Sequence, residues 1–221
     1  MIDISKSTAL LISAILLTIP GGALGGIIFS ENFDDGVADG FTVLGGEWEV
    51  VNGTYHAHTQ GFEFWGISLA GSAEWGDYHF ECDLYAEGSV NQVVWFRVFS
   101  PLHYYELVVR ADPWNDAFLN KMINGNKVVL AYDPYYPNSP ETWHHIQIDV
   151  VANEIMARFD EDLLFDIYDF SSPYLQGHIA LASYSGGVIQ WQDVFFDNVV
   201  VEVFVISNER QTWGQVKNLY R

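Results

Sequence analysis

Short apolar or alternating segments, separated by turn residues, follow one another along almost the whole chain. The clearest is Tyr78–Tyr85, in which apolar residues at even positions alternate with polar ones. Such a period of two is typical of a strand with one buried face, so the pattern predicts a strand that carries Cys82 into the core. An Asn52-Gly53 pair between two further runs of this kind indicates a β-hairpin.

About a dozen segments have this character. They are Trp48–Val51, Thr54–Ala57, Tyr78–Tyr85, Val93–Phe99, Tyr104–Arg110, Phe118–Ile123, Lys127–Tyr132, Trp143–Val151, Ile155–Phe159, Leu163–Tyr168, Ile179–Tyr184, Val188–Trp191 and Phe195–Val203. Strands at near-regular spacing, with neither repeats nor a linker, predict one all-β domain built as a sandwich or barrel.

The two ends of the chain differ from this pattern. Thr8–Ile19 is apolar and free of charge, and Pro20 interrupts it before it reaches the length of a membrane-spanning helix. A signal peptide over residues 1–25 is therefore expected, with an uncleaved anchor as the alternative. We expect the fold to occupy residues 26–204. Residues 205–221 form a tail, in which Thr212 could begin a short C-terminal helix.

The charge balance narrows the possible partners. The 221 residues hold 29 Asp and Glu against 9 Lys and Arg, a formal net charge of -20. Such a surface repels nucleic acid and anionic membranes, while neutral or cationic ligands and divalent cations remain possible. The single Cys82 cannot form a disulfide within the chain. We predict a secreted or extracellular protein, with a periplasmic or cell-surface location also possible, and no membrane span after signal cleavage.

The order of motifs adds a resemblance to a known family. The motifs are FSENFDDG, GEWEVVNGTYHA, GDYHFECDLY, VVWFRVFSPLHYYELVVR, TWHHIQIDVV and GHIALASYSGGVIQWQDVFFDNVVVE. Together they span Phe29 to Glu202, and their order resembles the concanavalin A-like lectin/glucanase superfamily. Within it, the chain is similar to laminin-G-like modules and to the 3-keto-disaccharide hydrolase domain. The resemblance implies a two-sheet antiparallel jelly-roll sandwich that holds a glycan on its concave face.

The resemblance also indicates which side chains would meet a glycan. Arg97, Tyr104 and Glu106 would line the concave face, because sugars bind to aromatic rings and to charged hydrogen-bonding groups. Arg97 and Glu106 could instead form a buried ion pair that only fixes the packing of the sheet. The remaining expected contacts are Trp95 and Glu81 on the face, with Trp114, Tyr135 and Tyr136 at its rim. We therefore predict a non-catalytic, lectin-like carbohydrate-binding module.

Two other functions stay open. A glycoside or 3-keto-disaccharide hydrolase would use Glu81 or Asp83 with Glu106 as acid and base. Related glucanases carry a Glu-x-Asp-x-Glu run, and here the third acid, Glu87, comes too late in the strand. A structural or protein-binding surface module is the second alternative.

Metal binding is expected at the paired ends of the first and last strands. The family resemblance implies a structural Ca²⁺ there, and the matching acidic residues are Glu31, Asp34, Asp193 and Asp197. The same acids could simply end strands. His56 and His58 alternate along a strand and could reach one metal ion, but no third ligand lies near them in the sequence.

Overall fold

The computed structural model describes residues 23–87, 91–111, 113–186 and 191–205, and these residues form fifteen strands with no helix among them. The strands are β1 (Ala23–Glu31), β2 (Phe41–Gly45), β3 (Glu47–Val51), β4 (Thr54–Gln60), β5 (Phe64–Ala70), β6 (Tyr78–Glu87), β7 (Asn91–Ser100), β8 (His103–Arg110), β9 (Asp116–Ile123), β10 (Asn126–Asp133), β11 (Trp143–Val151), β12 (Glu154–Phe159), β13 (Asp162–Tyr168), β14 (His178–Ser185) and β15 (Trp191–Val205).

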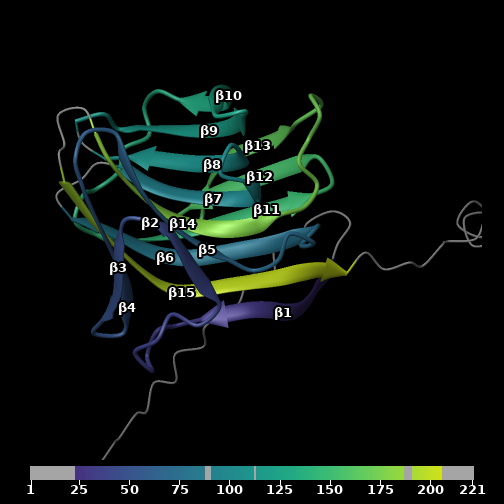
Figure 1. The fold of residues 1–221 in the computed structure, drawn as a ribbon. Coiled ribbons are helices and arrows are strands. Elements are labelled where there is room, and N and C mark those ends of the chain that lie inside the picture. Colours follow the sequence, from purple (N-terminus) through teal and green to yellow (C-terminus); the bar gives the residue numbers. More distant parts are fainter. Residues whose placement is uncertain (1–22, 88–90, 112, 187–190, 206–221) are drawn as a thin grey trace, which may run out of the picture. The chain divides into compact units, whose positions relative to one another are not determined.

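The strands form two sheets, which Figure 1 identifies by their labels. Sheet A has the order β13-β12-β11-β6-β15-β4-β3, and β1 also pairs with β15. Sheet B has the order β10-β9-β8-β7-β14-β5-β2. The pairs with a defined register are antiparallel. The predicted all-β, two-sheet antiparallel sandwich is confirmed.

The core lies between the two sheets and follows the alternation in the sequence. On β6, Phe80, Cys82 and Leu84 are fully buried in it, while the residues between them face outward. Leu107 of β8 and Ile148 of β11 contribute to the same core from the two sheets. Period-two patterning thus fixes which face of each strand is buried.

Several expectations about the ends of the chain fall on residues that the structure does not describe. These are most of the signal peptide and the C-terminal helix. The expected strand Val188–Trp191 also lies outside the described residues, except for Trp191, where β15 begins. Strand β1 begins at Ala23, so the last three residues of the expected signal peptide belong to a strand here. Leu24–Val205 form one compact unit. In the described part of the chain there is no helix long and apolar enough to cross a membrane.

A β-bulge in β7 changes the direction in which the side chain of Arg97, a predicted site residue, points. The β7–β8 register shifts between Phe96 and Ser100, and Arg97 has a φ of 46° in the left-handed region. This bulge moves Val98, rather than Arg97, onto the same outer cluster as Trp95. Arg97 turns into the interior and is 0% exposed. A bulge of this kind re-aims a side chain, which uniform alternation cannot anticipate.

Candidate functional site

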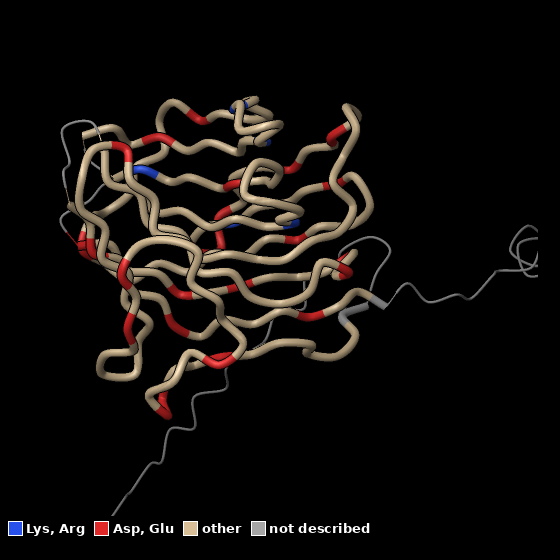
Figure 2. Tube along the Cα trace, viewed as in Figure 1, with Lys and Arg blue, Asp and Glu red and all other residues tan. Residues whose placement is uncertain are grey.

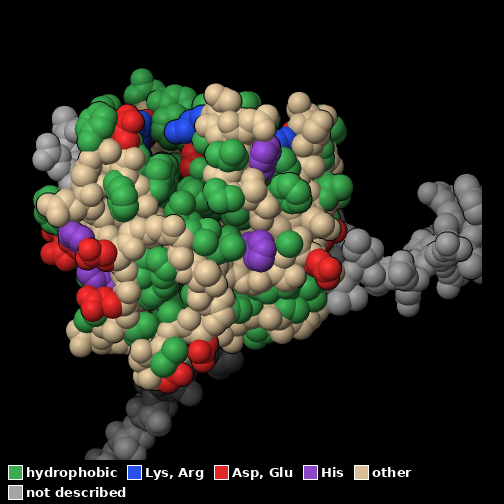
Figure 3. All heavy atoms as spheres, viewed as in Figure 1, with side chains coloured by type: hydrophobic (Ala, Val, Ile, Leu, Met, Phe, Trp, Pro, Cys, Tyr) green, Lys and Arg blue, Asp and Glu red, His purple; other side chains and the backbone are tan. Residues whose placement is uncertain are grey.

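The outer face of sheet B carries a second apolar cluster, separate from the core. Its buried members include Trp95 of β7, Tyr104 of β8 and Ala180 of β14, with Trp65 of β5 and Phe118 of β9 packed against them. This is the face on which the sequence places Trp95, Tyr104 and Glu106, and the structure does bring these three together. Figure 3 shows hydrophobic side chains gathered over the visible side of the described unit.

The centre of this face is filled by its own side chains. The rings of Trp95 and Tyr104 stack at a centroid distance of 3.7 Å and an interplanar angle of 17°, and both residues are buried. Trp65 lies 5.5 Å from Trp95 on its other side. Since the flat faces of Trp95 and Tyr104 are turned toward each other, neither ring is presented as an open platform for a sugar.

Glu106 lies beside this stack as a buried carboxylate. It is 1% exposed, and its Oε1 accepts a hydrogen bond from the Asn120 side-chain amide at 3.0 Å. The Lys127 ammonium, on an exposed side chain, is 3.7 Å from the same oxygen. Glu106 Oε2, Asn120 Oδ1 and the Trp95 indole N–H are buried without a hydrogen-bond partner among the described residues.

Burial dominates the ionisation of this carboxyl group. Desolvation raises the pKa of Glu106, and the nearby Lys127, Asn120 and Trp95 offset only part of that effect. A carboxylate with a raised pKa in a recessed, apolar setting is a stronger base than one in water.

A second arginine, Arg110, lies on this face at the end of β8. Arg110 continues the outward series of Tyr104 and Glu106 along β8, and it forms an ion pair with Asp116 of β9 through two hydrogen bonds. Its guanidinium lies 4.7 Å from the Trp114 ring centroid and 4.9 Å from that of Phe118. We call this group, with Tyr132, the aromatic–arginine cluster: Arg110, Trp114, Asp116, Phe118 and Tyr132.

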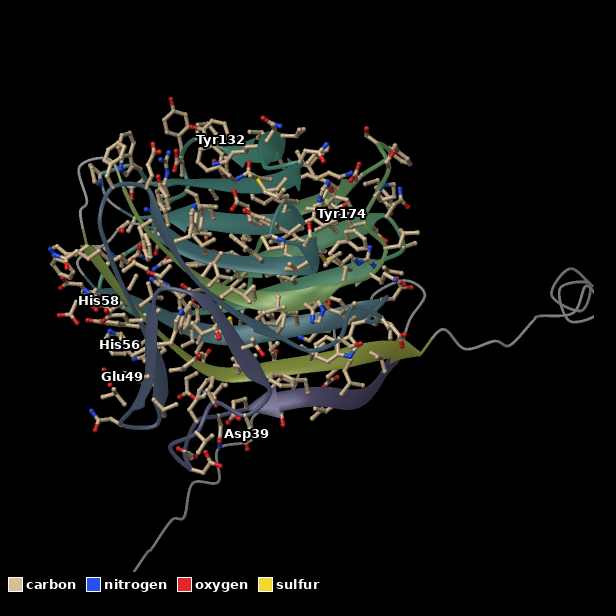
Figure 4. All side chains as sticks on the ribbon, in the orientation of Figure 1. Asp39, Glu49, His56, His58, Tyr132 and Tyr174 are labelled. Atoms are coloured by element: carbon tan, nitrogen blue, oxygen red, sulfur yellow. The ribbon has the colours of Figure 1, made fainter. Side chains whose placement is uncertain are left out.

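The aromatic–arginine cluster is exposed to solvent, whereas the side chains at the centre of the face are buried. Trp114 is 51% exposed and Tyr132 is 49% exposed, and the Tyr132 ring stacks on Phe118 at 4.5 Å. The Tyr132 hydroxyl donates to Asp116 at 3.4 Å. Tyr132 is labelled at the top of Figure 4. Together, rings and a fixed ion pair form a surface that can cover an apolar ring and bond hydroxyl groups.

Of the three aromatic residues predicted at the rim, two are exposed and one is half-buried. Trp114 and Tyr135 are exposed, Tyr135 to 85%. Tyr136 is half-buried and packs edge-on against Phe159, with its hydroxyl donating to the Phe159 carbonyl. Tyr136 therefore supports the packing of its loop rather than offering a contact surface.

The prediction that Arg97 lines the ligand face is wrong, and so is the alternative of an Arg97–Glu106 ion pair. The bulge in β7 sends the guanidinium into the interior, where it joins three separate connections of the chain. It donates to the carbonyls of Gly76 (3.3 Å), Ala152 and Tyr174 (2.8 Å) and to the carboxylate of Asp77 (3.0 Å). The arginine that does lie on the expected face is Arg110.

The placement of Glu81 and Asp83 with Glu106 is also wrong. Both acids face outward on β6 of sheet A, while Glu106 faces outward on sheet B, so the core separates them. They belong to a network that we call the sheet A histidine network. Its links are Arg158–Asp149 (3.0 Å), Asp149–His79 (2.7 Å), His79–Glu81 (3.2 Å), Glu81–His145 (3.6 Å), His145–Asp83 (2.7 Å) and Asp83–Asn198 (2.7 Å).

The network holds its two histidines in the charged form. Burial lowers the pKa of His79, but hydrogen bonds to Asp149 and Glu81 outweigh it and raise the pKa to about 9. The nearby Glu81 carboxylate and the hydrogen bond to Asp83 outweigh the effect of burial and raise the pKa of His145 to about 9. His145 and His79 in turn hold the pKa of Glu81 well below its usual range. Glu81 is therefore an ionised partner of two imidazolium groups, not a free acid or nucleophile.

The four acids proposed for calcium do not meet at one point. The Glu31 carboxylate accepts hydrogen bonds from the backbone N–H groups of Phe33 and Asp39, while Asp193 is bonded to two histidines. Asp193 and Asp197 are four residues apart on β15, about 13 Å along a strand. Asp34 lies close enough to Asp197 to raise its pKa, although burial is the larger cause. These hydrogen bonds do not gather the four residues around one point, and the structural Ca²⁺ stays a prediction.

The comparisons with known proteins agree with this architecture. The chain belongs to the 3-keto-alpha-glucoside-1,2-lyase-like domain family, whose model matches residues 29–202. This confirms the superfamily predicted from the motifs. No curated protein matches the chain.

Solved structures show the same fold at low identity. The carbohydrate binding module CBM66 from Bacillus subtilis is 22% identical, with a TM-score of 0.62, covering 74% of this chain and 95% of that one. The beta-glucanase of Bacillus licheniformis is 14% identical, with a TM-score of 0.59 over 81% and 98%. The catalytic domain of a laminarinase from Thermotoga petrophila is 12% identical, with a TM-score of 0.58 over 85% and 100%. Because binders and enzymes share this fold, the fold alone does not assign an activity.

Proposed function

We propose that the protein binds a glycan at the aromatic–arginine cluster on the outer face of sheet B. The observation that carries this proposal is the Arg110 guanidinium, fixed by Asp116 between the rings of Trp114 and Phe118. An exposed ring can cover the apolar face of a pyranose, while the ion pair donates to and accepts from its hydroxyl groups. The net charge of -20 favours a neutral or cationic glycan over an anionic one.

A glycan array with the leader-free protein, followed by calorimetry on the best ligand, tests this proposal. Trp114→Ala should weaken binding by about tenfold or more, because it removes a stacking ring. Trp143→Ala is the matched control, since Trp143 has a similar exposure of 45% but lies on sheet A. Equal affinity of Trp114→Ala and the unaltered protein, or no binding to any sugar, would contradict the proposal.

A second candidate is elimination on a 3-keto sugar, with Glu106 as the base. It is favoured by the family to which the chain belongs and by the buried, raised-pKa carboxyl group of Glu106. A ketone at C3 acidifies the neighbouring C2 proton, so one base suffices. Glu106 would take the C2 proton, a C1=C2 double bond would form as the C1–O bond breaks, and the departing alkoxide would leave as an alcohol by taking a proton from the Glu106 carboxyl group or from water. Appearance of enone absorbance from a 3-keto-α-glucoside, lost in Glu106→Gln, would establish this activity; a flat trace would exclude it for that substrate.

We also propose that the chain is secreted, on the strength of the apolar run Thr8–Ile19 and the Pro20 that ends it. Expression of the full chain in a secreting host, with the N-terminus of the exported protein sequenced, tests this. An exported product lacking about the first 25 residues is expected. Retention of the intact chain in the membrane fraction would favour the anchor.

A further inference from the structure

Two histidines on the outer face of sheet A converge on one carboxylate. His56 and His58 alternate along β4 with Tyr55 and Ala57, which are buried, so both imidazoles face outward. The neighbouring strand β15 places Asp193 directly opposite His58 in the antiparallel register. The third ligand that the sequence lacked nearby therefore comes from a strand about 135 residues further along the chain.

The polar atoms are already close together. His56 Nε2 lies 2.8 Å from Asp193 Oδ1, and His58 Nδ1 lies 2.7 Å from the same oxygen. The His56 ring is held by stacking on Phe195 at 4.4 Å and 11°. Its other nitrogen, Nδ1, faces Glu49 Oε1 of β3 at 3.6 Å. Figure 4 labels His58, His56 and Glu49 one below the other at the left of the described unit.

The surroundings of this group are strongly negative. In the strand registers, Glu47 lies opposite His58 on one side, and Glu87 lies opposite Asp193 on the other. Among the described residues, no Lys or Arg forms an ion pair with any of these acids or with Glu49. Figure 2 shows how much acidic positions outnumber basic ones along the trace, and Figure 3 shows two histidines among acidic side chains at the left edge.

We propose that His56, His58 and Asp193 bind a divalent transition-metal ion such as Zn²⁺. Two imidazoles and one carboxylate suit Zn²⁺, Cu²⁺ or Ni²⁺, whereas Ca²⁺ and Mg²⁺ prefer oxygen ligands alone. A carboxylate on the second nitrogen of a metal-bound imidazole fixes the ring and raises its basicity, and Glu49 is in that position. One or more open positions would be completed by water.

Metal binding requires the two imidazoles and the carboxylate to move apart. Both imidazoles now hydrogen-bond to Asp193 Oδ1, and no set of three such residues in the described part of the chain is arranged to hold a metal ion. Bonds of about 2.0–2.1 Å in a tetrahedral site separate ligand atoms by about 3.3 Å, roughly 0.5 Å more than the present contacts. The side chains can make this shift because they lie at the surface, 17% (His56), 36% (His58) and 21% (Asp193) exposed.

This site lies on sheet A, away from the aromatic–arginine cluster on sheet B, so it is independent of the proposed glycan binding. Calorimetry and Co²⁺ absorption spectroscopy, with ZnCl₂ and CoCl₂ added to the chelator-treated full chain, would test it. We expect about one Zn²⁺ per chain, together with a visible Co²⁺ band that indicates nitrogen ligation.

Substitutions then test which side chains bind the metal ion. His58→Gln and Asp193→Asn should each weaken Zn²⁺ binding by at least about tenfold. His145→Gln is the matched control, because it removes an imidazole from the sheet A histidine network on the same face and should leave the affinity unchanged. Circular dichroism of each variant checks that it is folded. Absence of stoichiometric binding, unchanged affinity in folded His58→Gln, or loss of binding in His145→Gln would each overturn the proposal.

Discussion

Replacement of Arg97 should destabilise the fold severely without affecting glycan binding. Arg97→Met keeps most of the side-chain volume but removes the guanidinium that joins three connections of the chain. The carboxylate of Asp77 would lose its cation, although it would still accept a hydrogen bond from the Ala152 backbone N–H at 2.7 Å. The carbonyls of Gly76 and Tyr174 would lose a charged donor.

The expected loss in the free energy of unfolding follows from the burial of Arg97. Removing one partner of a buried ion pair costs about 3–5 kcal/mol, because the remaining polar groups are left in a poorly solvated site. Arg97 is 0% exposed and Asp77 keeps a 24% exposed side chain, so we expect a value near the lower end, about 3 kcal/mol. With a urea m-value of roughly 2–3 kcal/mol/M for a domain of this size, the midpoint should fall by about 1–1.5 M.

Urea unfolding followed by tryptophan fluorescence measures this shift, and calorimetry on the folded variant measures glycan affinity. Arg110→Met is the comparison variant, because it changes the arginine on the proposed binding face. Its midpoint should fall less, since the Arg110 side chain is 24% exposed, while its glycan affinity should drop. A normal midpoint for Arg97→Met, or lost glycan affinity with normal stability, would refute the assignment of Arg97 to the interior.

Three further predictions concern separate parts of the sandwich. The pKa values of about 9 for His79 and His145 exceed the ordinary value of 6.5. The two protonated histidines therefore stabilise the fold fully below about pH 6.5, and this contribution is lost as the pH rises through 9. The unfolding free energy should fall by on the order of 2 kcal/mol between pH 6.5 and 10, and a double Gln variant should abolish this slope. Gly177→Ala should lower the melting temperature strongly, because its Cβ would lie 2.5 Å from the Arg97 carbonyl carbon, whereas Gly26→Ala meets nothing within 4 Å and should have little effect. Glu106→Gln should leave the melting temperature unchanged or raise it slightly, because it removes a buried charge, and a drop of several degrees would show that the charge is needed.

The alternation of β6 and β8 was enough to predict which residues enter the core and which face outward. Cys82 is buried as expected, and Tyr104, Glu106 and Arg110 share one face of β8. Strands β1 and β2 were not predicted, because their apolar residues sit in short segments without clean alternation. Strand β5 was also not predicted, although Trp65, Ile67 and Leu69 alternate in it with the buried small residues Gly66, Ser68 and Ala70. Alternation therefore located buried faces reliably only where a strand was long and regular.

The errors at the site have two physical causes. A positive φ at Arg97 cannot be deduced from a non-glycine residue in an apolar strand, and it reverses the face that one side chain occupies. The second cause is sheet assignment. Glu81 and Glu106 both face outward, but alternation does not say that β6 and β8 belong to different sheets. The convergence of His56 and His58 on Asp193 depends likewise on a strand pairing between distant parts of the chain.

The positions of the carboxylates restrict the chemistry that this face can perform. Glycosidases that use two carboxylates keep them about 5–9.5 Å apart. Glu81 lies on the far side of the core from Glu106, and packed sheets alone are about 10 Å apart. On the same face, Asp116 is four residues along β9 from Asn120, the residue opposite Glu106, which amounts to about 13 Å, and Arg110 already neutralises it. Neither Glu81 nor Asp116 is therefore placed to act with Glu106 in ordinary glycoside hydrolysis. The two candidate functions differ in what they require of Glu106. Elimination requires its carboxylate to take a proton from the sugar, and since Glu106 is 1% exposed, the side chains around it would first have to move aside. Glycan binding at the exposed Trp114 requires neither.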